Sequence, residues 1–296
     1  AGFISSLDRY MASLKEYAVD HRSGGQYFPN AVMPFRGLLE SELYAHSVLC
    51  RLMSRYAEYA GDEEASRIAD GVRLWIMVQK ETQEWDDDPA YLLALDAVMD
   101  GSSGLLDSRV LVLTRKYMKP FGEIRAAGND VSVRCRYLVE DASASGVSSG
   151  SASSAVAEYP GYREMAEGEV LRIGESILAV YEIWSAENRS YVRLSAPRPA
   201  SLRPKNQLSG MYRVPVRSRT RAGVPAAAFP YSYREVKQDC CRWFLEVLPE
   251  EKTVLTEVLT VTQAGVFSSP VAEVECLYAP HYRANDGSLP QFVSEK

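Results

Sequence analysis

The sequence has few histidines and no closely spaced cysteine pair of the zinc-binding type, which argues against a metal centre. Its three histidines, His21, His46 and His281, have no second histidine or carboxylate three or four positions further on, so none begins a metal-binding helix face. The five cysteines show no CxxC spacing. We therefore expect no metal and no cofactor, and nothing in the sequence favours a Cys–His dyad.

Long apolar runs are also absent. No stretch of about eighteen apolar residues occurs, so we expect no membrane-spanning segment. The chain shows no signal-peptide pattern and begins at Ala1 instead of a methionine. We expect it to be a processed product or a piece of a longer protein. The net charge of -6 at pH 7 argues against nucleic acid as a partner, because nucleic acid selects basic surfaces.

The composition is that of a soluble globular protein, with 46% hydrophobic and 24% charged residues among 296. This length allows two domains with substantial cores. The odd number and irregular spacing of the cysteines predict no disulfide framework, so we interpret most of them as buried small hydrophobes. Cys240 and Cys241 are adjacent, and a strand would bury one and expose the other. They are a redox site or two core fillers. We favour the second interpretation, because nothing supplies a low pKa.

A helical period of apolar residues runs through the first hundred residues. We expect a first helix with one apolar face near the start of the chain. A second helix is expected from Gly37 to Ala60, with Gly61 as its C-cap. Asp62 is expected to open a third helix. The buried stripe of this third helix is predicted to be Ala65, Ile68, Val72, Trp75, Ile76 and Gln79.

A fourth helix is expected to begin at Asp88, to end before Gly101, and to turn Leu92, Leu95 and Val98 inward. The acidic residues that precede it are a candidate metal site or glycosidase carboxylate pair. They are Glu84, Asp86, Asp87 and Asp88. We interpret this cluster as a helix cap and a solvated turn, because the capping signals are present.

The hydrophobic period changes from 3.6 to 2 after the helices, so we expect a structural break near Gly101–Leu105. Alternating residues from Val131 to Tyr137 indicate a strand in a small β region, residues 105–157, that ends in a low-complexity linker. The linker contains Gly146-Val147-Ser148-Ser149-Gly150, which matches the nucleophile-elbow pattern. Neither the strand nor the helix that this motif needs surrounds Ser148, so we expect no catalytic residue there.

Residues 158–296 read as many short strands with Gly and Pro turns, which predicts an antiparallel β-sandwich. The last three strands are expected at Arg242–Leu248, Thr253–Thr262 and Val271–Tyr278. Their alternation predicts a set of inward-facing residues, namely Trp243, Leu245, Val247, Leu255, Leu259, Val274 and Tyr278. The predicted fold class is therefore α+β: an α-helical region, residues 1–104, followed by an antiparallel β-sandwich.

Two stretches of the sandwich resemble the closing module of bacterial alpha-2-macroglobulin-family proteins. One contains the turn Ile173-Gly174-Glu175, the strand Arg189–Leu194, and then Arg198-Pro199-Ala200, Arg203-Pro204 and Leu208-Ser209-Gly210 in the family's order. The other runs from Phe229 to Ser288 and ends in Tyr278-Ala279-Pro280. The sequence departs from the family pattern at Ser195-Ala196 and at Arg203, where acidic residues are common.

The resemblance implies the C-terminal portion of a macroglobulin-like protein. Residues 1–104 are then the end of the thioester-domain-like α/α toroid, and residues 158–296 the terminal macroglobulin-type sandwich. Such a parent is an endopeptidase inhibitor of the periplasm or cell envelope that traps proteases. The implied partners of the chain are those proteases, through the parent, and other domains of the same protein. No cysteine here begins the Cys-x-Glu-Gln motif of the family's thioester, so we expect a chain that is not an enzyme and forms no covalent adduct.

Two other functions remain open at this stage. One is a carbohydrate-active or carbohydrate-binding protein, because helical toroids joined to β-sandwiches also occur in that class; its only candidate residues are the acidic cluster at 84–88 and Trp85. The other is a surface adhesin built from Ig-like domains. Fold analogy alone does not separate the three.

Overall fold

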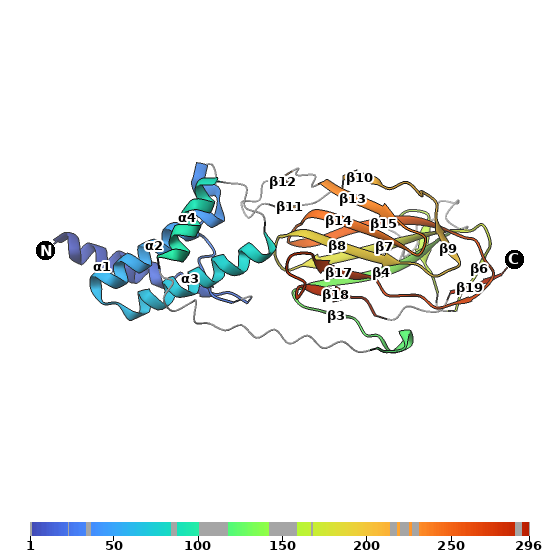
Figure 1. Ribbon diagram of the computed structural model, residues 1–296, viewed down its shortest axis with the longest axis horizontal. Helices are drawn as coiled ribbons and strands as arrows, with labels where there is room; N and C mark the ends of the chain where they lie inside the picture. The colour runs from blue at the N-terminus through green and yellow to red at the C-terminus, as the bar shows by residue number, and fades with distance from the viewer. Residues whose placement is uncertain are drawn as a thin grey trace, which may run out of the picture. The chain divides into compact units, whose positions relative to one another are not determined.

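The computed structural model describes residues 2–22, 24–33, 37–83, 88–100, 118–141, 159–166, 168–213, 218–219, 225–226, 231–287 and 292–295. The chain divides into two compact units, Ala1–Arg115 and Lys116–Lys296, coloured from blue to green and from green to red in Figure 1. The division falls beyond the break expected near Gly101–Leu105. No helix among the described residues is long and apolar enough to cross a bilayer.

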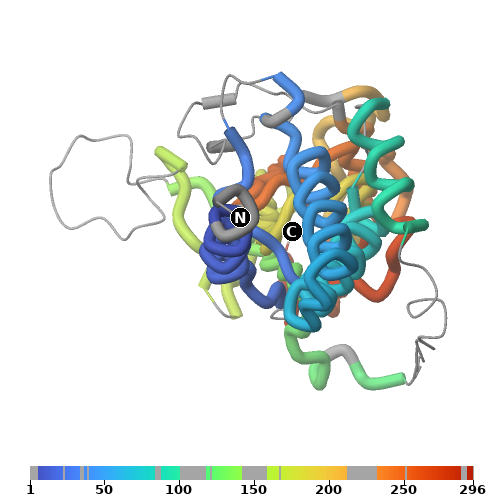
Figure 2. The backbone as a smooth tube through the Cα atoms, turned by 90° about the vertical axis from the view of Figure 1, so that its left-hand side faces the viewer, coloured from blue at the N-terminus to red at the C-terminus, as the bar shows by residue number. Residues whose placement is uncertain are grey.

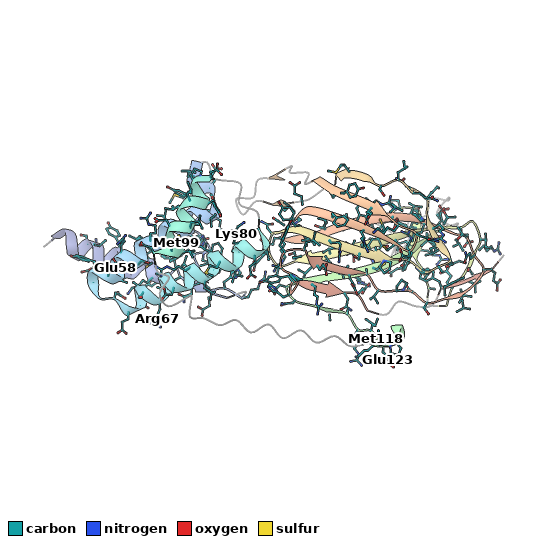
Figure 3. All side chains as sticks on the ribbon, in the orientation of Figure 1. Glu58, Arg67, Lys80, Met99, Met118 and Glu123 are labelled. Carbon is teal, nitrogen blue, oxygen red and sulfur yellow. The ribbon has the colours of Figure 1, made fainter. Side chains whose placement is uncertain are left out.

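The first unit is helical, as its period predicts. It consists of α1 (Gly2–Lys15), a 3-10 turn η1 (Gly37–Glu40), α2 (Glu42–Ala60), α3 (Glu63–Thr82), α4 (Asp88–Met99) and a hairpin of β1 (Val19–Asp20) and β2 (Gln26–Tyr27). Figure 2 shows α2 and α3 side by side. Glu58, Arg67 and Lys80, labelled in Figure 3, are exposed residues of this helix pair.

Local capping fixes the joint between α2 and α3 where the sequence predicts it. Gly61 has φ of 65°, a left-handed conformation that glycine adopts without steric cost, and its N–H bonds to the carbonyl of Ala57. Asp62 accepts a hydrogen bond from the Ala65 N–H at 2.9 Å. The predicted stripe of α3, from Ala65 to Gln79, is buried throughout.

The predicted inward face of α4 is wrong at Leu92 and Leu95, whereas Val98 packs against the helical core as predicted. Leu92 and Leu95 are 64% and 40% exposed, whereas Ala90, Ala94 and Ala97 are buried. These alanines recur at helical spacing and form a small-residue face. The buried Arg73 side chain of α3 donates to the Ala97 carbonyl at 3.0 Å. Close packing therefore selects the alanine face over the larger leucines.

The second unit is a sandwich of two main antiparallel sheets (Figure 1). The five-stranded sheet has the order β5 (Tyr162–Glu164), β4 (Val131–Glu140), β7 (Ser176–Ser185), β15 (Glu251–Val261) and β9 (Leu202–Pro204). The seven-stranded sheet has the order β10 (Gly210–Arg213), β13 (Tyr231–Val236), β14 (Cys240–Leu248), β8 (Arg189–Pro197), β17 (Glu273–Cys276), β18 (Arg283–Asn285) and β3 (Ala127–Gly128). The helical region followed by an antiparallel sandwich confirms the predicted fold class.

Smaller elements complete this unit. A three-stranded sheet joins β16 (Gly265–Phe267), β19 (Phe292–Glu295) and β6 (Val170–Arg172), the last two in parallel. A ladder joins β11 (Ser218–Arg219) and β12 (Pro225–Ala226), and η2 (Phe121–Glu123) precedes β3.

The strand from Val131 belongs to the sandwich and not to a separate small β region. β4 pairs with β7 along its length, from Val131 opposite Ser185 to Val139 opposite Ile177. Its inward residues, such as Val133 and Cys135, share one core with both main sheets. β4 belongs to the sandwich because the buried strand β7 needs a hydrogen-bonded strand along this edge. The first part of the expected β region, residues 105–117, and its low-complexity linker, residues 142–157, lie outside the described residues.

Five of the seven predicted core residues of the last strands are buried, and two are not. Trp243, Leu245, Leu255, Leu259 and Val274 are at most 3% exposed. Val247 is 37% exposed and Tyr278 is 76% exposed. The alternation of buried and exposed positions shifts beside Tyr191 of the neighbouring strand β8. Tyr191 has a left-handed φ of 56°. Beyond that point Leu248 of β14 is the buried residue instead of Val247, and Tyr278 lies past the end of β17.

Candidate functional site: a hydrogen-bonded loop on the sandwich

All five cysteine thiols are free and buried, and burial opposes ionisation of each. Desolvation raises the pKa of Cys50 to about 11, of Cys241 to about 12 and of Cys276 to about 11. It also raises the pKa of Cys135 and Cys240. A thiol acts as a nucleophile only as its thiolate. None of the five is therefore set up as a reactive group.

The adjacent pair does not alternate as expected, because both thiols are buried: Cys240 is 8% exposed and Cys241 0%. Cys241 points into the sandwich core. Cys240 begins β14 where the preceding turn closes on β8, with the Lys237 N–H bonded to the Cys240 carbonyl and the Arg198 N–H to the Asp239 carbonyl. The turn therefore covers the side of the strand that faces away from the core. Cys241 is therefore a core filler and Cys240 a thiol buried under the turn, and this environment does not match a redox pair.

The other candidate groups do not converge on a site. Ser148, Glu84, Asp86 and Asp87 lie outside the described residues, and Asp88 is the exposed first residue of α4. Over the described part of the chain, no three His, Cys, Asp or Glu side chains gather as a metal site. A hollow of about 140 Å³ in the helical unit, lined by Lys15, Gln26, Glu64 and Arg67, is smaller than most small-molecule pockets.

The histidines have structural roles in the described contacts. His46 is fully buried; its Nε2 accepts the Phe28 N–H at 3.0 Å, and its Nδ1 lies 2.7 Å from the Glu42 carbonyl. These partners require the neutral Nδ1–H tautomer. The His46 ring stacks 4.1 Å from Trp75, and His21 meets Tyr27 edge-on at 4.8 Å. His281 is exposed beside Tyr282.

The loop between β17 and β18 is the strongest candidate for a functional surface. It presents the large apolar side chains of Leu277, 40% exposed, and Tyr278, 76% exposed. Hydrogen bonds at both ends fix its backbone: the Cys276 N–H bonds to the Tyr282 carbonyl at 3.0 Å, and the Tyr282 N–H to the Ala279 carbonyl at 2.9 Å. Exposed aromatic side chains on a fixed backbone are typical of protein–protein contacts.

Strand β8 holds this loop from the side. The Leu277 N–H bonds to the Tyr191 carbonyl at 2.9 Å, and the rings of Tyr191 and Tyr278 meet edge-on at 5.1 Å. Tyr191 has φ of 56°, which is unusual for a bulky residue. Such strain persists only where the surroundings fix it, and it concentrates at functional sites.

Arg189 anchors the same loop through an aromatic ring. This side chain is 1% exposed, and its guanidinium carbon lies 3.9 Å from the centroid of the Tyr282 ring. Among the described residues, its Nε and one terminal nitrogen have no hydrogen-bond partner. A desolvated cation–π contact contributes about 2 kcal/mol, which offsets part of the cost of burying the charge.

The sequence does not predict this loop, because its alternation makes the segment up to Tyr278 the end of a strand. Tyr278 continues the period of Val274 and Cys276, so the alternation assigned it to the core. Pro280, two residues further, was the available signal for a turn. Nothing in the sequence marks Arg189 as buried or Tyr191 as left-handed.

The motif residues at 198–210 form a second fixed loop, held by a buried charge network. Glu257 of β15 is bonded to Arg234 of β13 and lies 3.7 Å from Arg198, so it joins the two main sheets. Their side chains are 1%, 5% and 1% exposed, respectively. Arg234 also donates to the carbonyls of Asn206 at 3.0 Å and Leu208 at 3.2 Å. The network therefore positions the Leu208-Ser209-Gly210 segment.

Residues 137–281, just under half of the chain, match the family model of the bacterial alpha-2-macroglobulin MG10 domain. This match includes the loop at 277–281 and the motif loop at 198–210. No curated protein matches the sequence.

Several solved structures are similar over most of this chain. Salmonella alpha-2-macroglobulin reacted with methylamine is 14% identical, with a TM-score of 0.41 over 89% of this chain and 18% of that one. Trypsin-activated alpha-2-macroglobulin from Escherichia coli is 13% identical, with a TM-score of 0.48 over 86% and 19%. A native Escherichia coli structure from domain MG7 to the C-terminus is 13% identical, with a TM-score of 0.42 over 90% and 44%. The chain thus spans less than half the length of each.

Proposed function

We propose that this chain, which belongs to the bacterial alpha-2-macroglobulin family, is one part of a protease-trapping inhibitor of the cell envelope. Its own part is non-enzymatic: the sandwich offers fixed surfaces to other domains of the same protein. The match of residues 137–281 to the family's MG10 domain carries this proposal. The proteases trapped are partners of the whole protein and not of this chain alone.

The chemistry of the described residues supports a role through surfaces. The thiols are buried, which raises their pKa, and the 277–282 loop exposes the large side chains of Leu277 and Tyr278. We further propose that residues 1–104 are the end of a thioester-domain-like helical toroid. Covalent trapping then depends on sequence outside this chain, because an acylating thioester needs a Cys and a Gln three residues on, and no cysteine here has that partner.

The alternatives have no comparable support. A carbohydrate-active function relied on residues 84–88, of which only Asp88 lies among the described residues, and there it begins a helix. An adhesin of Ig-like domains shares the sandwich architecture but explains none of the motif residues.

A cage assay tests the proposal on the full reading frame that contains this chain. The protein is incubated with an endoprotease, and cleavage of a large protein substrate and of a small peptide is followed. Trapping predicts that cleavage of the large substrate falls at least tenfold while cleavage of the peptide continues, because the cage excludes only large molecules. Loss of both activities, or of neither, contradicts the proposal.

A further inference from the structure

The charges of the sandwich are unevenly distributed along the sequence. Between Glu187 and Glu235 there are nine arginines and one lysine but no acidic residue, in a chain whose net charge is -6. A stretch with charges of one sign is a candidate interaction surface where its cations lack acidic partners. The stretch covers β8, β9, β10 and the start of β13, and so includes one edge of the seven-stranded sheet.

Four of these ten cations already have partners in the sandwich unit, three of them buried and Arg193 half-buried. Arg198 and Arg234 share Glu257, Arg193 pairs with Glu275 at 2.5 Å, and Arg189 lies on the Tyr282 ring. These residues stabilise the fold and are not available to a ligand.

Arg203 and Lys205 are different, because they lie at the surface where β9 leads into the β10 edge. Neither has an acidic partner among the residues that the structure describes. Arg203 donates to the Gln238 carbonyl at 2.7 Å, and Lys205 is exposed with its backbone N–H on the Val258 carbonyl. In the described part of the chain, no carboxylate therefore compensates these two charges.

Large exposed aliphatic side chains follow these cations along the chain. Leu208 is 78% exposed and Met211, on the edge strand β10, is 65% exposed. Met211 is the cross-strand partner of Tyr233, which is 42% exposed. The buried Arg234 holds the Asn206 and Leu208 carbonyls, so these side chains project from a loop that is fixed.

We propose that this basic and apolar edge, formed by Arg203, Lys205, Leu208 and Met211, docks on an anionic lipid surface. Basic side chains attract the edge to acidic headgroups, and their aliphatic stems reach past the headgroup layer. Leu208 and Met211 then enter the boundary between headgroups and acyl chains, as apolar residues of peripheral proteins do. The cations alone would also fit an acidic protein, whereas the exposed aliphatic side chains of Leu208 and Met211 supply the apolar part that a lipid surface takes up.

Vesicle sedimentation of the full chain tests this proposal. The vesicles are phosphatidylcholine alone, or phosphatidylcholine with phosphatidylglycerol, at low and high salt. We expect binding only to the anionic vesicles, and at least tenfold weaker binding at high salt, because exposed charges are screened. Equal binding to both compositions, or no binding to the anionic vesicles at low salt, overturns the proposal.

Matched variants locate the surface. R203E/K205E should weaken binding at least tenfold, whereas R125E/R283E, with the same charge change on exposed residues near the opposite edge of the sheet, should change it less than threefold. L208S/M211S should also weaken binding at least threefold without loss of stability, because both side chains are exposed. Equal effects of the two charge reversals overturn the assignment. If only R203E/K205E weakens binding, charge alone holds the edge at the headgroups, and the proposed insertion of Leu208 and Met211 is wrong.

Discussion

Removal of the Glu257 carboxylate should destabilise the sandwich more than most single changes. In Glu257→Ala, Arg198 and Arg234 keep their positive charges in a site where their side chains are only 1% and 5% exposed. Breaking a buried ion pair by removing one partner costs about 3–5 kcal/mol, because the remaining charge stays desolvated and unpaired. For a unit of this size, that corresponds to a fall in Tm of roughly 6–20 °C.

The assay is urea unfolding of the variant followed by tryptophan fluorescence. Trp243 is a suitable reporter, because its ring lies 5.4 Å from the Arg234 guanidinium and is 1% exposed. The midpoint should fall while the slope stays unchanged, since the surface exposed on unfolding is the same.

The matched control is Glu235→Ala, which removes a carboxylate paired with Lys237 and Arg242 at 3.4 and 3.5 Å on the exposed side of the sheet. Surface pairs contribute about 0–1 kcal/mol, so this change should be nearly silent. If Glu257→Ala and Glu235→Ala destabilise equally, the buried network is not what holds the loop at 198–210.

Three further predictions concern packing and pH. Val274→Asp should unfold the sandwich while Glu273→Lys on the other face is tolerated, as circular dichroism will show; equal effects mean that the register is wrong. Ala94→Leu should cost about 1–3 kcal/mol by overpacking the face of α4, and unchanged thermal stability refutes that packing. Burial raises the pKa of Asp286, whose ionised form is therefore disfavoured in the fold. The unfolding free energy of the unchanged chain, relative to that of Asp286→Asn, should therefore rise as the pH falls towards 3.8. A difference that stays constant with pH contradicts this.

The sequence predicts those parts of the fold where local patterns decide the outcome. Gly61 and Asp62 mark the joint of two helices, because a left-handed cap and an N-cap have strong residue preferences. Strict alternation located β4 and assigned the inward positions of β15. In each case the periodicity of the side chains matches the periodicity of the element.

The errors arise where contacts distant in sequence decide the outcome. The face of α4 depends on how closely another helix approaches, so Ala94 is buried instead of Leu95. The side on which Val247 lies depends on a left-handed Tyr191 in the neighbouring strand, 56 residues earlier by the printed numbering. Glu257 meets Arg198 and Arg234 only through the sandwich. No local pattern reports these contacts.

The most direct test of the central claim is the intact mass of this chain after incubation with methylamine and with several endoproteases. If the chain contributes surfaces and no acylating or hydrolytic chemistry, its mass stays unchanged with methylamine. No protease adduct should then survive denaturation and reduction. Incorporation of methylamine, or a stable adduct with a protease, contradicts the account, because none of the five buried cysteines has a partner that can form the reactive ring.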